Sequence, residues 1–158
     1  MSSPQPIIRR GQVLDLAAVL ALLKSSGLPT ADLTSAPDLH LWVAEERESL
    51  FGVIGMERFG VYALLRSLAV GARYQRRGFG HQLVARLERE AQADGVEQLV
   101  LLTETAERFF GAIGYEAIDR SDVPEKIKQC AEFRSLCPAS AVCMTKSLAS
   151  SRTGVPHG

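Results

Sequence analysis

The sequence lacks an excess of charge of either sign. Its 158 residues include 18 basic and 18 acidic side chains, so the formal net charge is zero. Broad binding to nucleic acid or to a membrane surface needs a basic excess, and we expect neither. The apolar runs are also far too short to span a bilayer. Any anion that binds here is therefore expected to be held by local geometry.

Cysteine and histidine are scarce as well. The three cysteines, Cys130, Cys137 and Cys143, are odd in number and form no Cys-x-x-Cys pair. This usage indicates reduced thiols rather than a disulfide framework. The three histidines form no cluster, and no metal site is expected. The N-terminus lacks the basic start and apolar stretch of a signal peptide, so we expect a cytoplasmic protein.

The chain does contain a regular series of strand and helix patterns. Apolar spacing and turn residues predict strands and helices in the order of an α/β (α+β) domain on one mixed sheet. The predicted strands cover 6–10, 40–46, 49–59, 62–70, 97–103, 115–119 and 140–148, and the helices 13–27, 79–93, 105–114 and 123–136. We expect a single domain over residues 1–148, followed by a disordered tail over 149–158.

A glycine pair marks the junction between the strand at 62–70 and the helix at 79–93. Gly78 and Gly80 stand at the start of that helix, with three arginines close before them. Glycine lets a ligand approach the main chain, and unpaired N–H groups with the helix dipole attract phosphate. The junction therefore reads either as a diphosphate cradle or as a simple tight turn. A dinucleotide fingerprint would need glycine at Leu83, and a P-loop would need Gly-Lys-Ser/Thr.

The segment Gln75-Arg76-Arg77-Gly78-Phe79-Gly80 matches the pattern Gln/Arg-x-x-Gly-x-Gly/Ala and follows a strand that ends in LAV. In both respects it resembles the GNAT N-acetyltransferase superfamily. Downstream, FFGAIGY at 109–115 resembles the end of a helix in the same family. The resemblance covers about residues 7–148. It implies a mixed sheet whose middle strands splay apart and admit acetyl-coenzyme A (acetyl-CoA).

Three further segments narrow the resemblance. GLPTADL at 27–33, LLT at 101–103 and the segment 132–148 resemble the arsenic-resistance N-acetyltransferases. Small bacterial N-acetylglutamate synthases share part of this pattern. The resemblance implies an acetyl-CoA-dependent N-acetyltransferase that acts on a small, amino-acid-like amine or an arsenic-containing analogue. The alternatives are an N-acetylglutamate synthase-like enzyme and a CoA-binding sensor without catalysis. A homodimer is common for such folds, by analogy alone.

The resemblance also implies a cofactor site. The glycine segment would donate backbone N–H groups to the CoA diphosphate, and the strand end would pair with pantetheine as an added strand does. Phe110 would lie against the pantetheine end, and no metal is needed. The implied cofactor-binding residues are Leu68, Ala69, Val70, Gln75, Arg76, Arg77, Gly78, Phe79, Gly80 and Phe110.

At two catalytic positions the sequence departs from the family. Leu64 stands where many members place a glutamate that accepts the amine proton, and Phe110 stands where many place a tyrosine that reprotonates the thiolate. A low-pKa thiolate can leave unassisted, but the base is missing. Glu104, just after the strand at 97–103, is the carboxylate candidate, and a water chain is equally open. Alternatively, Glu104 stabilises the start of the next helix.

The acceptor site is expected on the strand at 62–70 and in the loop before residue 40. Arg66, on the same strand face as Leu64 and Leu68 if the strand is regular, could hold a substrate carboxylate through two hydrogen bonds, or it could be a partly solvated edge residue. Leu28, Pro29 and Asp32 lie in the loop that roofs this site in the family. The three cysteines could bind arsenic(III) as soft ligands, although small buried apolar side chains are the favoured interpretation.

Overall fold

A computed structural model of the chain describes residues 5–28, 30–34, 39–130, 133 and 140–148. The strands are β1 (Ile7–Arg10), β2 (Leu39–Glu46), β3 (Ser49–Phe59), β4 (Tyr62–Val70), β5 (Gln98–Thr103), β6 (Glu116–Ala117) and β7 (Val142–Ser147). The helices are α1 (Leu16–Ser25), α2 (Phe79–Ala93), α3 (Glu107–Ala112) and α4 (Glu125–Lys128). The tail predicted at 149–158 lies outside the described residues.

The strands form one sheet in the order β1-β2-β3-β4-β5-β7-β6. Neighbouring strands run antiparallel except for β4 and β5, which are parallel. A parallel pair needs a crossover connection, and α2 provides it between β4 and β5. The predicted α/β fold on a mixed sheet is therefore confirmed.

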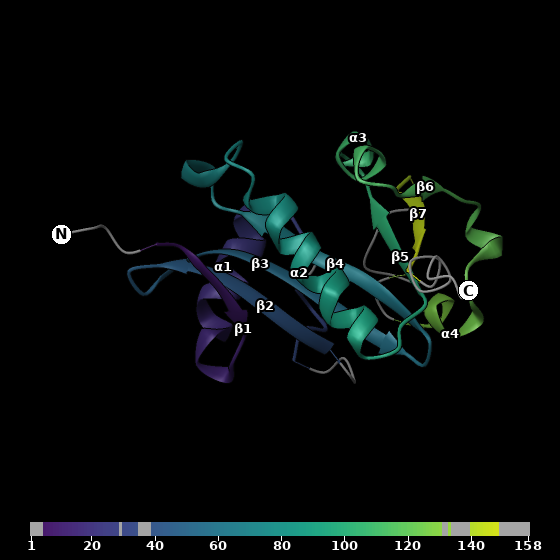
Figure 1. Cartoon of the computed structure of the whole chain (residues 1–158), viewed down its shortest axis with the longest axis horizontal. Coiled ribbons are helices and arrows are strands. Elements are labelled where there is room, and N and C mark those ends of the chain that lie inside the picture. The colour runs from purple at the N-terminus through teal and green to yellow at the C-terminus, as the bar shows by residue number, and fades with distance from the viewer. Residues whose placement is uncertain (1–4, 29, 35–38, 131–132, 134–139, 149–158) are drawn as a thin grey trace, which may run out of the picture.

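The long helices cover opposite faces of the sheet (Figure 1). The apolar side of α2, with Leu83 and Leu87, belongs to the largest core cluster. On the other face, Val19 and Leu23 of α1 pack with Val53 of β3. None of the helices in the described part of the chain is long and apolar enough to cross a membrane.

Strands β4 and β5 separate after a short paired region. They pair only at Tyr62–Gln98, Ala63–Leu99 and Leu64–Val100, although β4 continues to Val70 and β5 to Thr103. Beyond Leu64, β4 stays paired with β3, and β5 stays paired with β7. The sheet thus opens between its two central strands, as the family resemblance implies.

A bulge in β4 changes which face its residues occupy. Gly55 pairs with Arg66 whereas Val53 pairs with Ala69, so β4 has an extra residue here. Ser67 has a left-handed backbone with φ of 61°. The extra residue reverses the alternation, and Leu68 packs with the α2 cluster while Leu64 packs on the opposite face. The expectation that Arg66 and Leu68 share a face with Leu64 is therefore wrong for Leu68.

Two elements near the C-terminus are shorter than predicted. The strand expected at 115–119 is reduced to Glu116–Ala117 at the sheet edge. The helix expected at 123–136 ends at Lys128, and the Cys130 N–H donates to the Ile127 carbonyl three residues back, closing a tight turn. Much of the remaining predicted span lies outside the described residues.

Candidate active site

The opening between β4 and β5 forms a cleft. Both strands contribute to its lining, and α3 with its preceding loop and Leu28 after α1 contribute the rest. The lining residues are Leu28, Leu65, Arg66, Ser67, Leu68, Leu101, Leu102, Thr103, Thr105, Ala106 and Phe110. Leu28, Arg66, Leu68 and Phe110, four of the residues expected in the site, therefore meet at one cleft.

A second hollow lies at the start of α2. It is lined by Val70, Tyr74, Gln75, Arg76, Gly78, Phe79, Gly80, His81 and Phe109. Gly78 caps the helix with φ of 87°, a left-handed conformation that glycine adopts without steric cost. The first N–H groups of a 15-residue helix open here, and they attract an anion. The glycine segment therefore lines a concave hollow, called the cradle below, and its binding of a diphosphate stays a prediction.

Gly80 keeps the main chain of this cradle in close contact with α3. A Cβ atom at Gly80 would lie 3.3 Å from Cζ of Phe109, and the Phe109 ring in turn lies 4.8 Å from the ring of His81. A side chain at position 80 would therefore contact the Phe109 ring and would fill part of the hollow.

The residues before the cradle are fixed by contacts within the chain. The Gln75 side chain donates a 2.9 Å hydrogen bond to the Val70 carbonyl, which ties the loop to the end of β4. Tyr74 stacks on Phe51 at 3.9 Å between ring centroids. The Arg77 guanidinium lies over the Tyr74 ring at 5.3 Å. Arg77 therefore covers aromatic rings, whereas Arg76 is a lining residue of the hollow.

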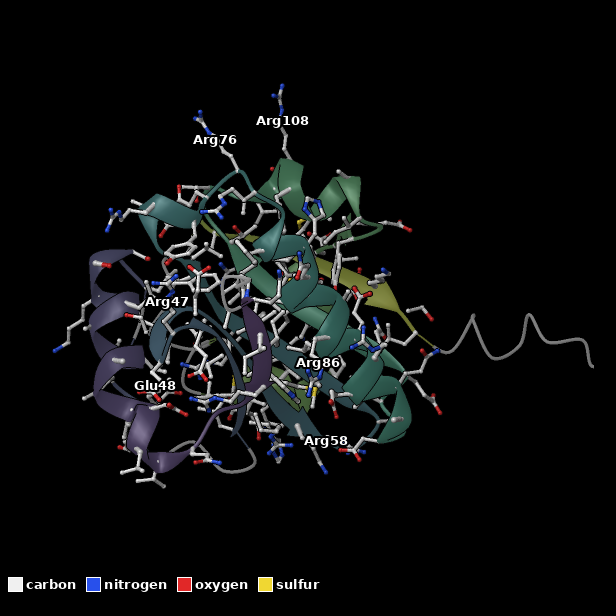
Figure 2. All side chains as sticks on the ribbon, turned by 60° about the vertical axis from the view of Figure 1, so that its left-hand side comes forward. Arg47, Glu48, Arg58, Arg76, Arg86 and Arg108 are labelled. Atoms are coloured by element: carbon white, nitrogen blue, oxygen red, sulfur yellow. The ribbon has the colours of Figure 1, made fainter. Side chains whose placement is uncertain are left out.

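Arg76 and Arg108 extend from the same end of the molecule, away from its body (Figure 2). Arg76 comes from the loop before α2, with a left-handed φ of 66°, and Arg108 comes from the start of α3. The sequence interpretation did not include Arg108, since no motif points to it. Its position adds a second cation to the end of the molecule where Arg76 lies.

The candidate base Glu104 lies in the loop between β5 and α3. Its side chain is exposed, and it is not among the residues that line the cleft, although Thr103 and Thr105 on either side are. Thr103 accepts a 2.9 Å hydrogen bond from the Ala106 N–H at the start of α3. The structure thus places Glu104 at the rim of the cleft rather than inside it.

Arg66 lies in a buried cluster with two carboxylates. Its guanidinium donates to both oxygens of Asp32 at 2.7 and 2.6 Å and to Oε1 of Glu57 at 3.2 Å. Its Nε donates to the Ser67 hydroxyl at 3.3 Å. Arg66 thus has two acidic partners from the chain itself, and its fully buried side chain contradicts the alternative of a partly solvated edge residue. The contact with a substrate carboxylate stays a prediction.

The two carboxylates of this cluster are shifted in opposite directions. The hydrogen bonds from Arg66 lower the pKa of Asp32, whereas burial raises the pKa of Glu57 despite the same guanidinium. The sequence interpretation found Asp32 but missed Glu57. An acidic residue within the apolar strand segment GVIGME was the available signal.

The remaining predicted positions are accounted for as follows. Ala69 is buried against the α1 face, and Pro29 lies outside the described residues.

Cys130 and Cys143 are buried in one apolar cluster, and burial raises the pKa of the Cys143 thiol to about 11. Cys137 lies outside the described residues. Within the described ranges, no group of three or more His, Cys, Asp or Glu side chains could hold a metal ion.

The splayed sheet and the glycine cradle define the class of protein. Residues 25–130 match the family model of the acetyltransferase (GNAT) domain, so the chain belongs to the GNAT acetyltransferase family. An uncharacterized N-acetyltransferase of Chlorobaculum tepidum is 28% identical over 109 residues, which are 68% of this chain and 70% of the relative. The arsenic-resistance subgroup is not confirmed by these comparisons.

Solved structures with low sequence identity share the fold. N-acetylglutamate synthase from Neisseria gonorrhoeae, complexed with coenzyme A and N-acetyl-glutamate, aligns with a TM-score of 0.78 and 18% identity over 93% of this chain. The chain spans only 36% of that larger protein. The ribosomal-protein-S18-alanine N-acetyltransferase from Escherichia coli aligns with a TM-score of 0.71 and 17% identity, covering 91% of this chain and 94% of that one.

Proposed function

We propose that the chain transfers the acetyl group of acetyl-CoA to the amine of a small molecule. One observation carries the proposal: neighbouring residues line both hollows. Leu68 and Phe110 line the cleft between the central strands, and Val70 and Phe109 line the cradle at α2. An extended cofactor bound at the cradle would thus be led along the end of β4 into the cleft.

The chemistry follows from this placement. Backbone N–H groups at 78–80 hold the diphosphate, and Leu68, Ala69 and Val70 pair with the pantetheine arm. A backbone N–H at the bulge of β4 stabilises the oxyanion that forms when the neutral amine attacks the thioester carbon, typically worth a few kcal/mol of barrier. The C–S bond then breaks, and the thiolate leaves with the electron pair past Phe110. No residue of the chain needs to form a covalent intermediate.

Two routes are open for the proton that the amine loses. One passes to Glu104 at the rim of the cleft, and the other passes through water to bulk solvent. The exposure of Glu104 and its position outside the lining favour the water route. An α-amino group with a pKa of about 8 is partly neutral at physiological pH. Part of the acceptor can therefore attack without first losing a proton to a protein base.

The acceptor class rests on the resemblance. Amino-acid-like amines and arsenic-containing analogues are the first candidates. An N-acetylglutamate synthase-like activity is the alternative, supported by the fold similarity to that enzyme. A CoA-binding sensor is the non-enzymatic alternative, and Leu64 and Phe110 at the usual catalytic positions support it. Cytoplasmic location and homodimerisation also stay predictions.

An acceptor screen tests the proposal. Release of CoA thiol from acetyl-CoA is followed with a panel of amines, and CoA binding is measured by calorimetry on the same protein. Turnover with a small amine supports the enzyme, and turnover with glutamate above other amines supports the synthase-like alternative. Tight CoA binding without turnover for any amine would favour the sensor. Absence of CoA binding would refute all three.

A further inference from the structure

Among the described residues that line the cleft, only Ser67 has a left-handed backbone. Its φ is 61°, a conformation that residues other than glycine rarely adopt and that costs energy. Ser67 stands in the bulge of β4, where the pairing with β3 shifts between Val53 and Gly55. Glycine would fit this position without strain. A serine here therefore indicates that the hydroxyl, which glycine lacks, has a role.

Ser67 is the most buried of the three hydroxyl residues that line the cleft in the described part of the chain. It is 8% exposed, whereas Thr105 is exposed and Thr103 is half-buried. The Thr103 hydroxyl also accepts the hydrogen bond from Ala106 that fixes the start of α3. A polar group that is shielded from bulk water needs a hydrogen-bond partner from the protein, from ordered water or from a ligand.

The Ser67 hydroxyl accepts one hydrogen bond and keeps its own hydrogen available. Nε of Arg66 donates to the Ser67 Oγ at 3.3 Å. The hydroxyl can still donate one hydrogen bond, and no acceptor among the described residues takes it. Because hydrogen bonds in series polarise one another, donation from the guanidinium strengthens the hydroxyl as a donor. Ser67 is thus suited to an oxygen that gains negative charge in the cleft.

The place of Ser67 along β4 fits an oxygen of the cofactor. Ser67 directly precedes the segment 68–70, which would pair with the pantetheine arm, and it lines the cleft together with Leu68. Val70, at the other end of this segment, lines the cradle. The pantetheine arm ends in the thioester, so a cofactor led from the cradle along β4 would bring its thioester to the bulge.

We propose that the Ser67 hydroxyl donates a hydrogen bond to the thioester carbonyl oxygen of acetyl-CoA and stabilises the oxyanion that this oxygen becomes. The inference rests on the proposed function and adds a side chain to the backbone N–H of the bulge. As the amine nitrogen bonds to the carbonyl carbon, an electron pair moves onto the oxygen. The pair returns when the C–S bond breaks, and Ser67 keeps its proton throughout. Arg66 acts in this as a positioning residue for the hydroxyl.

Two substitutions separate the hydroxyl from the backbone strain. Ser67→Gly removes the hydroxyl and accepts the left-handed backbone, whereas Ser67→Ala removes the hydroxyl and keeps the strain. We expect kcat to fall about a hundredfold in both, the scale of one lost oxyanion donor, with little change in the KM for acetyl-CoA. The free energy of unfolding should instead be higher for Ser67→Gly than for Ser67→Ala. If Ser67 only supported the fold, kcat would follow stability.

Glu48→Gly is the matched control for the backbone. Glu48 has a φ of 65°, is exposed in the turn between β2 and β3, and lines neither hollow. The substitution relieves the same kind of strain and should leave kcat unchanged. A comparable fall of kcat in Glu48→Gly, or wild-type kcat in both folded Ser67 variants, would overturn the inference while leaving the acetyl transfer intact.

Infrared difference spectroscopy of bound acetyl-CoA, isotopically labelled at the carbonyl carbon, keeps the test separate from turnover. A hydrogen bond to the carbonyl oxygen weakens the C=O bond, so the thioester band should lie at a lower frequency in wild type than in both Ser67 variants. This difference without acetyl transfer to any amine would support the hydroxyl contact and refute only the enzymatic function. The same band position in all three proteins would overturn the inference, and absence of acetyl-CoA binding would refute both proposals.

Discussion

Asp32 and Arg66 are 34 positions apart in the sequence but are joined by two hydrogen bonds of 2.6 and 2.7 Å in a buried site. The pair connects the segment after α1 to the bulged part of β4. Because both partners are charged and shielded from water, removal of Arg66 would leave Asp32 without this buried cation, and removal of Asp32 would leave two donors of Arg66 without their acceptors. The pair therefore ties the segment after α1 to β4 next to the cleft that Arg66 lines.

Replacement of Arg66 by alanine should strongly destabilise the protein. Asp32 and Glu57 would remain buried close together without their cation, and losses of this kind are about 3–5 kcal/mol. Urea denaturation measures the change in the free energy of unfolding. Arg89→Ala, at an exposed position of α2, is the matched control, and we expect a change within about 0.5 kcal/mol there. Similar small effects in both variants would contradict the buried cluster.

The contribution of Asp32 to stability should depend on pH in a defined direction. Its pKa is lowered in the folded protein, chiefly by the hydrogen bonds from Arg66, so the folded state holds the ionised form more strongly than the unfolded state does. The stabilisation is thus fully present above the ordinary pKa of 3.8 and is lost as pH falls through the lower folded value. Asp32→Asn should lower the free energy of unfolding by about 1.5–3 kcal/mol near neutral pH.

Denaturation at a series of pH values from neutral downward measures this dependence. The difference between wild type and Asp32→Asn should shrink below the ordinary aspartate pKa. Asp94→Asn breaks the pair of Arg58 with Asp94, whose side chain is 62% exposed, and should show little effect at any pH. A constant difference for Asp32→Asn across the series would contradict an ionised, Arg66-bound carboxylate.

The sequence predicted the succession of strands and helices along the chain and the glycine start of α2, because both depend on local patterns. The predicted limits of the helix at 79–93 agree with those of α2, since Gly78 and Gly95 bound a strongly amphipathic segment. The partners of Arg66 could not be predicted, because they depend on a bulge at Ser67 that reverses strand alternation and on a loop contact across 34 residues. The strand at 115–119 and the helix at 123–136 were predicted too long, because edge pairing limits β6 and a tight turn follows α4.

Glu104→Gln should leave kcat little changed if the amine proton leaves through water. The carboxylate is exposed and outside the cleft lining, so substitution by the isosteric amide removes only a solvated charge. The pH profile of kcat/KM measured with the best acceptor should keep its shape. A loss of about a hundredfold or more, the size of general base catalysis, together with loss of the acidic limb of the profile, would assign the proton to Glu104.

Gly80→Glu should abolish tight binding of acetyl-CoA while the protein stays folded. The new Cβ would meet only the tip of the Phe109 ring, at 3.3 Å, which can move aside, so the fold tolerates the change. Its carboxylate, however, would stand in the hollow at the start of α2, where like charges repel the diphosphate. Since such juxtaposition costs several kcal/mol, we expect affinity measured by calorimetry to fall at least about tenfold. Ala85→Glu adds the same side chain to an exposed position of α2 and should bind acetyl-CoA as wild type does. Equal affinities of Gly80→Glu and Ala85→Glu would show that the cofactor diphosphate does not lie at this helix.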